Sequence, residues 1–266
     1  MKNRTILILL YTLAIALLFG FSFLPSDFRI YRTILSLFLP FAIGVGIFVK
    51  KNGTKPPMYQ GEGRDALPYL LFAPILLGIL LLSVLTTLLF SLVGLSNPPI
   101  DKIPIGEAIV LYALLPAILE EALYRILPAL ALCDEDTHSV CIFSTLVFSL
   151  AHISIFSIPY ALFAGLSFFL VNRLARNPLP SILLHLANNL LSLLLSYATN
   201  QAPILLVMIS ALVLLSALSL LLMAKFYREE TTLAIQSLRK KREPFRFTVD
   251  LLIYLAFTLT MTILFI

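Results

Sequence analysis

Three ionisable residues lie close together in an otherwise apolar stretch of the sequence. Glu120, Glu121 and Arg125 fall between Pro116 and Pro128. A charged side chain at the centre of a membrane-spanning helix costs about 2.5 to 3.5 kcal/mol on insertion scales, so such residues usually have a function. On a helix, Glu121 and Arg125 share a face and are expected to form a structural ion pair. Glu120 points about 100° away and has no basic partner in this stretch, which makes it a candidate general base or acid.

The chain contains three histidines, and two of them lie in apolar stretches. Phe148 precedes His152 by four residues and Asn189 follows His185 by four, so each pair is expected to share one helix face. A single histidine in a span is usually a packing residue with a hydrogen bond. Two histidines, an asparagine and the spare carboxylate of Glu120 together favour a reactive site. A base for water and donors for a developing oxyanion are the groups that amide hydrolysis needs.

These residues must be positioned by helices that lie in a lipid bilayer. The 266-residue chain is 60% hydrophobic and 12% charged, and its mean hydropathy of +0.99 excludes an ordinary soluble domain. The predicted fold class is therefore all-α, a polytopic transmembrane helix bundle of about eight or nine spans. The candidate spans are Thr5–Phe23, Tyr31–Val49, Leu67–Leu95, Gly106–Leu132, Val140–Ile158, Pro159–Val171, Pro180–Ala198, Pro203–Lys225 and Val249–Ile266.

The basic residues predict how the bundle is oriented. With a cytoplasmic N-terminus, fifteen Lys and Arg residues fall in inside segments, and only Arg29, Arg32 and Lys102 fall outside. Because cytoplasmic loops are enriched in Lys and Arg, this bias predicts a multi-pass protein of the cell membrane with its N-terminus in the cytoplasm. The net charge of +5 then belongs to loops that face the inner leaflet, and no nucleic acid partner is expected.

The motifs in this central part resemble those of a known family. An EExxxR motif at Glu120 to Arg125, an FxxxH motif at Phe148 to His152 and an HxxxN motif at His185 to Asn189 follow one another on successive polar-bearing spans. In this order they resemble the CPBP family, which includes the CAAX prenyl endopeptidases of the Rce1 type and bacterial Abi members tied to bacteriocin self-immunity and peptide processing. The resemblance covers about Gly106 to Ala198.

The resemblance and the hydropathy pattern together predict a domain organisation. Residues 106–198 would be the CPBP/Abi-like catalytic core. Residues 1–105 would supply three N-terminal transmembrane helices. Residues 199–266 would supply C-terminal transmembrane helices with a basic cytoplasmic loop.

By resemblance the chain is expected to be an intramembrane endopeptidase, a hydrolase that cleaves a membrane-associated protein or peptide at a site within the bilayer. Glu120 and His152 would activate water, and His185 with Asn189 would stabilise the oxyanion. The supporting residues would be Glu121, Arg125 and Phe148.

Several alternatives stay open. Glu120, His152 and His185 could instead bind Zn²⁺, although the HExxH spacing of many zinc peptidases is absent, and we favour a mechanism without metal. A non-catalytic bacteriocin self-immunity or scaffold protein would keep the same fold. A proton-coupled transporter could also use acids and histidines within its spans, but usually spreads them along a pathway.

The predicted spans contain one inconsistency. His185 lies about five residues from the inner end of its span and His152 about twelve from its own, so the two imidazoles would differ in depth by roughly 10 Å. Shifted span boundaries, or tilted or broken helices near Pro159 and Pro180, would remove this difference.

Overall fold

The computed structural model describes residues 2–25, 28–53, 56–60, 63, 66–95, 103–198, 201–229, 232, 245 and 247–264. Within these residues all regular secondary structure is helical, which confirms the predicted all-α class. Six helices are long and apolar enough to cross a membrane, and two shorter apolar helices accompany them. The chain is therefore a multi-pass membrane protein. Most of the predicted basic loop of the C-terminal segment lies outside the described residues.

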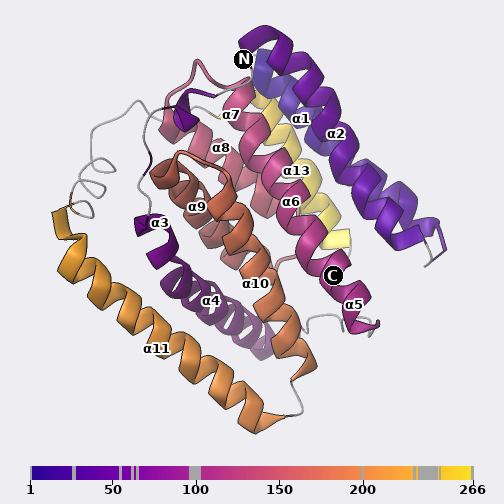
Figure 1. The fold of residues 1–266 in the computed structure, drawn as a ribbon. Coiled ribbons are helices and arrows are strands. Elements are labelled where there is room, and N and C mark those ends of the chain that lie inside the picture. Colours follow the sequence, from indigo (N-terminus) through magenta and orange to yellow (C-terminus); the bar gives the residue numbers. More distant parts are fainter. Residues whose placement is uncertain are drawn as a thin grey trace.

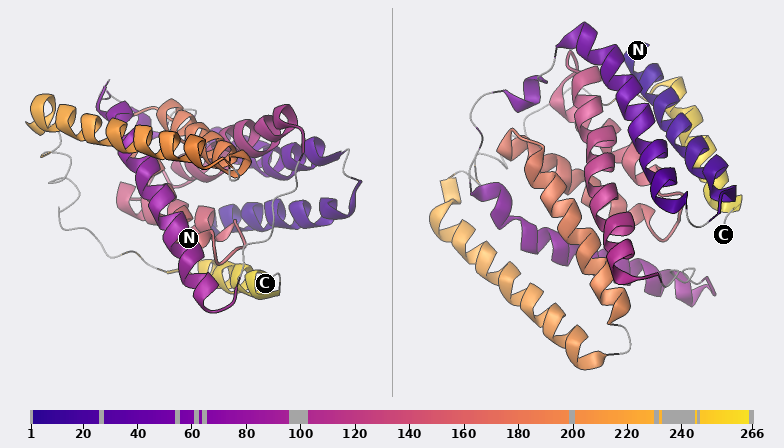
Figure 2. Two further views of the ribbon diagram at one scale, coloured as in Figure 1. Left: turned by 90° about the horizontal axis from the view of Figure 1, so that it is seen from below. Right: turned by 45° about the vertical axis from the view of Figure 1, so that its right-hand side comes forward.

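The N-terminal and C-terminal helices pack together on one side of the bundle (Figures 1 and 2). Helix α1 (Lys2–Gly20) contacts α2 (Arg29–Asn52) and α13 (Val249–Leu264). The buried ring of Tyr11 on α1 stacks on Tyr124 at 5.1 Å between centroids and also contacts Phe143 and Tyr254. This aromatic cluster joins both ends of the chain to its central helices.

The central helix runs from Ile105 to Ala131 and contains two segments with π-helical hydrogen bonds. It consists of α5 (Ile105–Ala108), a π-helical segment (Ile109–Leu114), α6 (Leu115–Glu121), a second π-helical segment (Ala122–Ile126) and α7 (Leu127–Ala131). Each π-helical segment ends two residues before a proline, Pro116 or Pro128. Proline lacks the N–H for an i to i−4 bond and clashes with that carbonyl, and a wider turn relieves this conflict.

The helix after the central one is shorter than the sequence predicted. Helix α8 spans Thr137–Leu150 and ends within the bundle, and residues 151–157 turn back into α9 (Ile158–Ala175). The predicted span Val140–Ile158 is therefore wrong at its C-terminal end. His152 lies in this turn instead of in the middle of a span, and the ring of Phe148 contacts both His152 and His185.

The remaining helices enclose the other side of the central helix. Helix α10 (Leu179–Tyr197) contacts α6, α9 and the first π-helical segment, and α4 (Phe72–Leu92) contacts α9 and α10. Helix α3 (Leu67–Leu70) leads into α4. Helix α11 (Ala202–Phe226) packs on α4 at the edge of the bundle, and its exposed leucines give it a surface suited to lipid (Figure 1).

Asp136 caps α8, and we expect its removal to destabilise the fold. Its Oδ1 accepts the backbone N–H groups of His138 and Ser139 at 2.9 and 3.1 Å. Partial burial works to raise the pKa of Asp136, but the hydrogen bonds from Ser139 and His138 outweigh it and lower this pKa. Asp136→Ala should cost about 1 kcal/mol of unfolding free energy at neutral pH, measured by thermal unfolding in detergent.

The pH dependence of this loss has a defined sign. Because the pKa of Asp136 is lowered in the folded state, the cap stabilises the fold above the unfolded pKa of about 3.9 and is lost as the pH falls through the folded pKa. The difference between wild type and Asp136→Ala should therefore shrink in acid. Asp134→Ala, in the same loop but without a helix to cap, is the control. An equal loss in both variants would contradict the capping role.

Candidate active site

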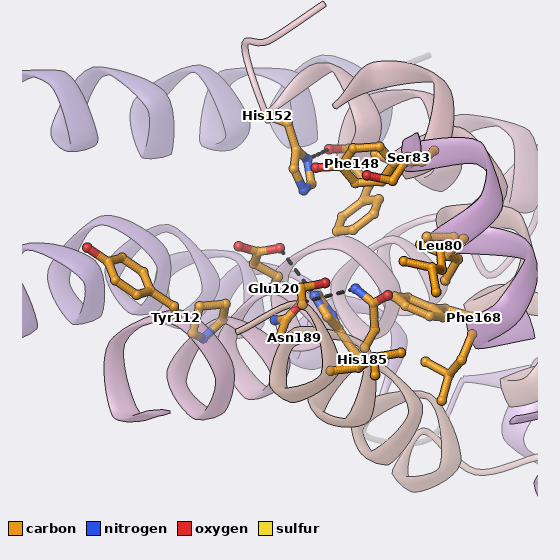
Figure 3. Close-up of a pocket in the computed structure, with 18 of the residues that line it drawn as sticks. Leu80, Ser83, Tyr112, Glu120, Phe148, His152, Phe168, His185 and Asn189 are labelled. Atoms are coloured by element: carbon orange, nitrogen blue, oxygen red, sulfur yellow. Dashed lines mark hydrogen bonds and ion pairs between the residues drawn. The ribbon is translucent and has the colours of Figure 1, made fainter. Parts of the chain in front are cut away.

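A cavity of about 410 Å³ lies between the central helix and helices α4, α8, α9 and α10. Its lining includes Glu120, His152, His185 and Asn189, which the sequence had singled out on three separate segments. Figure 3 shows Glu120 between His152 on one wall and His185 with Asn189 on the other. The volume lies in the range of small-ligand and substrate sites. The fold thus brings these four predicted residues to one place, and their chemical roles stay predictions.

The two neighbouring glutamates have different surroundings. The side chain of Glu120 is 22% exposed and faces the cavity, with its Oε2 3.9 Å from Nε2 of His185. The side chain of Glu121 is fully buried. Because α6 turns them about 100° apart, only Glu120 can meet water or a substrate in the cavity.

Glu121 contacts two helical segments, α10 and the second π-helical segment, from behind the cavity wall. Its Oε1 lies 3.2 Å from Nδ1 of His185, and its Oε2 accepts a hydrogen bond of 2.6 Å from the hydroxyl of Ser181. The predicted ion pair with Arg125 is present, but at 3.8 Å it is the longest of these contacts. Glu121 is therefore placed to orient His185 in addition to balancing Arg125.

Phe148 lines the cavity, and Arg125 packs against its ring behind the cavity lining. The guanidinium of Arg125 is fully buried, and its carbon lies 4.0 Å from the ring centroid of Phe148, a cation–π contact. Within the described part of the chain the nitrogens of Arg125 have no hydrogen-bond acceptor. The ring of Phe148 also meets His152 and His185 edge to face, with centroids 4.9 and 5.8 Å apart. Phe148 thereby fixes both imidazoles against one aromatic surface.

The hydrogen bond of His152 determines its tautomer. Nδ1 lies 3.0 Å from the backbone carbonyl oxygen of Phe148, which can only accept, so Nδ1 carries the proton. In the neutral ring, Nε2 is then an acceptor able to bind or deprotonate water. The next residue, Ile153, has a positive φ of 46°, which is strained for a β-branched side chain. The strained turn after α8 holds His152 at the cavity wall.

The contacts of His185 and Asn189 define what each can donate. With Nδ1–H directed to Glu121, Nε2 of His185 is an acceptor in the neutral ring and a donor in the imidazolium. The Oδ1 of Asn189 accepts a hydrogen bond from the amide of Asn188 at 3.2 Å, which leaves its own Nδ2 to donate. His185 in its charged form and Asn189 can thus supply two donors on one wall of the cavity.

Two residues that contact the site residues were not predicted from the sequence: Ser181, which contacts Glu121, and Asn188, which contacts Asn189. Ser181 precedes His185 by four residues on α10, so the same spacing argument that linked His185 to Asn189 could have found it. Its backbone N–H also donates to Oδ1 of the buried Asn172 at 3.3 Å. The motif spacing gave no reason to select Asn188, which is only the sequence neighbour of Asn189.

In the described structure, Glu120, His152 and His185 are not arranged as the ligands of a zinc ion. Among the described residues no group of three or more His, Cys, Asp and Glu side chains is arranged to hold a metal ion. Glu120 and His185 approach each other, whereas His152 lies on the opposite wall of the cavity (Figure 3). We therefore assign no step of the chemistry to a metal at these residues.

The hydrogen bond from Ser181 to Glu121 should contribute strongly to stability. Ser181→Ala would leave a buried carboxylate oxygen without this donor, and hydrogen bonds to charged groups contribute about 1.5 to 3 kcal/mol. We expect a fall of that size in the unfolding free energy, measured in detergent. The matched control is Ser167→Ala on α9, because Ser167 is also buried and has no hydrogen bond from its hydroxyl within the described residues. Equal effects of the two substitutions would contradict the assigned role of Ser181.

Comparison with known proteins supports the resemblance drawn from the motifs. A family model described as Type II CAAX prenyl endopeptidase Rce1-like matches residues 102–191. The matched segment contains Glu120, His152, His185 and Asn189, and it extends from the start of the central helix into α10. No curated protein and no solved structure matches the chain. Residues 102–191 therefore match an Rce1-like domain, and this match supports membership of the CPBP family, which includes proteases.

Proposed function

We propose that the chain is an intramembrane endopeptidase that hydrolyses a peptide bond of a membrane-associated protein or peptide. The observation that carries this proposal is the meeting of Glu120, His152, His185 and Asn189 around one cavity inside the helix bundle. The Glu120 carboxylate lies between the imidazole of His152 on one wall and the side chains of His185 and Asn189 on the other. An acid–base pair and two donors are the groups that amide hydrolysis needs.

In the proposed reaction, Glu120 and Nε2 of His152 hold a water molecule between them. The Glu120 carboxylate takes a proton from this water, and the water oxygen forms a bond to the carbonyl carbon of the substrate. The electron pair of the C=O bond moves to oxygen, and Nδ2 of Asn189 and Nε2 of the His185 imidazolium donate hydrogen bonds to this oxyanion. When the tetrahedral intermediate collapses, the C–N bond breaks and the leaving nitrogen takes the proton from Glu120.

Glu121 supports this reaction without touching the substrate. Its contact with Nδ1 fixes the orientation of the His185 ring and directs Nε2 toward Glu120 in the cavity. The ring of Phe148 packs against both histidines, and Arg125 forms an ion pair with Glu121.

The position of the cavity indicates from which side a substrate arrives. Its lining comes from residues 112–120 in the first two thirds of the central helix and residues 185–195 toward the end of α10. With the cytoplasmic N-terminus that the Lys and Arg distribution predicts, both segments run from near the middle of the bilayer toward the side away from the cytoplasm. We therefore expect the substrate to reach the site from the lipid bilayer or from the outer side of the cell membrane.

Substitution of the proposed base tests the function. Purified protein would be incubated with a peptide library in detergent, and cleavage measured by mass spectrometry. Glu120→Gln should lower the cleavage rate by about 10²- to 10⁴-fold, and Asn189→Ala by about 10²- to 10³-fold. Glu107→Gln is the matched control, since Glu107 lies on the same central helix and does not line the cavity. Undiminished cleavage by Glu120→Gln would exclude the mechanism.

The choice between a glutamate-type and a metal-dependent reaction needs a separate test. We expect the wild-type rate to be unchanged after incubation with a strong chelator and dialysis, because the proposed steps use only side chains of the chain. Restoration by Zn²⁺ of activity lost to the chelator would show instead that a metal takes part.

A further inference from the structure

A second, smaller cavity of about 150 Å³ meets the first at Glu120. Tyr112, Pro116 and Glu120 line both cavities. On its other side the smaller cavity is lined by α1, by the start of α2 and by Leu111 of the central helix. Glu120 therefore stands between two spaces, with Tyr112 beyond it on the side away from Phe168 and Leu80 (Figure 3).

The smaller cavity has a positively charged wall. Arg29 and Arg32 lie in the first turn of α2, and both line it together with Thr33. Nε of Arg32 is buried and has no hydrogen-bond acceptor in the part of the chain that the structure describes. Within the same part, neither arginine is in an ion pair, and Glu120 is paired with His185 instead. Buried donors without a partner are costly, which suggests that a ligand supplies the acceptor.

The size and place of this cavity restrict the ligand. Pockets that hold a whole small molecule usually measure about 300 to 1,000 Å³, so 150 Å³ suits one end group. Because Tyr112, Pro116 and Glu120 line both cavities, a group in the smaller cavity lies directly beside a molecule in the larger one. Guanidinium groups bind carboxylates with two parallel hydrogen bonds.

We propose that Arg29 and Arg32 form a subsite for a carboxylate of the peptide substrate, next to the peptide bond that the water activated by Glu120 attacks. The inference rests on the proposed peptidase function and adds a charge preference to it. The carboxylate is either the free C-terminus of the peptide or the side chain of an Asp or Glu residue, and both present the same two oxygens to the arginines.

Three probes with one apolar sequence test the subsite. The first is an N-acetylated peptide with a free terminal carboxylate, the second is its terminal amide, and the third is an amide with one internal Glu. Binding to purified protein in detergent would be measured by calorimetry. We expect at least one carboxylate probe to bind about tenfold or more tightly than the neutral amide. The probe that shows this preference identifies the source of the carboxylate.

The preference should depend on the arginines of the smaller cavity. Arg32→Gln should remove it and Arg29→Gln should weaken it, while binding of the neutral amide stays at the wild-type level. Arg228→Gln, at an exposed arginine outside both cavities, is the control and should keep the preference. Equal binding of all three probes by wild type would overturn the subsite. The subsite would also be overturned if short-chain phosphatidic acid bound in an Arg32-dependent manner and the carboxylate probes did not bind.

Failure of the subsite and failure of the peptidase proposal can be told apart. Cleavage of acidic and neutral peptides at equal rates and affinities would contradict the subsite and leave the peptidase function intact. Carboxylate-selective binding that depends on Arg32, without cleavage of any probe or library peptide, would support the subsite as a binding site and contradict the peptidase function.

Discussion

The arrangement of the site depends on a fully buried carboxylate in the middle of an apolar bundle. An ion taken out of water costs several kcal/mol unless neighbouring groups compensate it. For Glu121 that compensation comes from His185 and Ser181 on α10 and from Arg125 one turn further along the central helix. The need to satisfy one charge therefore fixes the position of α10 against the central helix, and the imidazole that touches this charge also lines the cavity.

The same constraint separates the roles of two adjacent residues. Glu121 is held on the inside of the central helix, so Glu120 must face the cavity. The π-helical segment after Glu121 turns Arg125 under Phe148, whose ring contacts both histidines. A rigid aromatic and ionic layer thus supports a more open polar cavity, as expected for a site whose reacting groups are held by packing and not by the substrate.

Much of this could be predicted from the sequence because the signals are local. Spacing of four residues placed Phe148 with His152 and His185 with Asn189, and hydropathy gave the helical class. The end of α8 at Leu150 could not be predicted, since the apolar run continues through the turn that follows it. The contact between His185 and Glu121 and the approach of α2 to Glu120 join residues far apart in the chain, and only tertiary packing decides them.

The most direct test of the central claim is a double-mutant cycle between Glu121 and His185 on the free energy of unfolding. Glu121→Gln, His185→Gln and the double variant would be compared with wild type in one detergent. If the buried carboxylate is held by this histidine, the double variant should lose less than the sum of the single losses, with a coupling of about 1 kcal/mol or more. Losses that simply add would show that the two residues do not stabilise each other, and the account of the site would be contradicted.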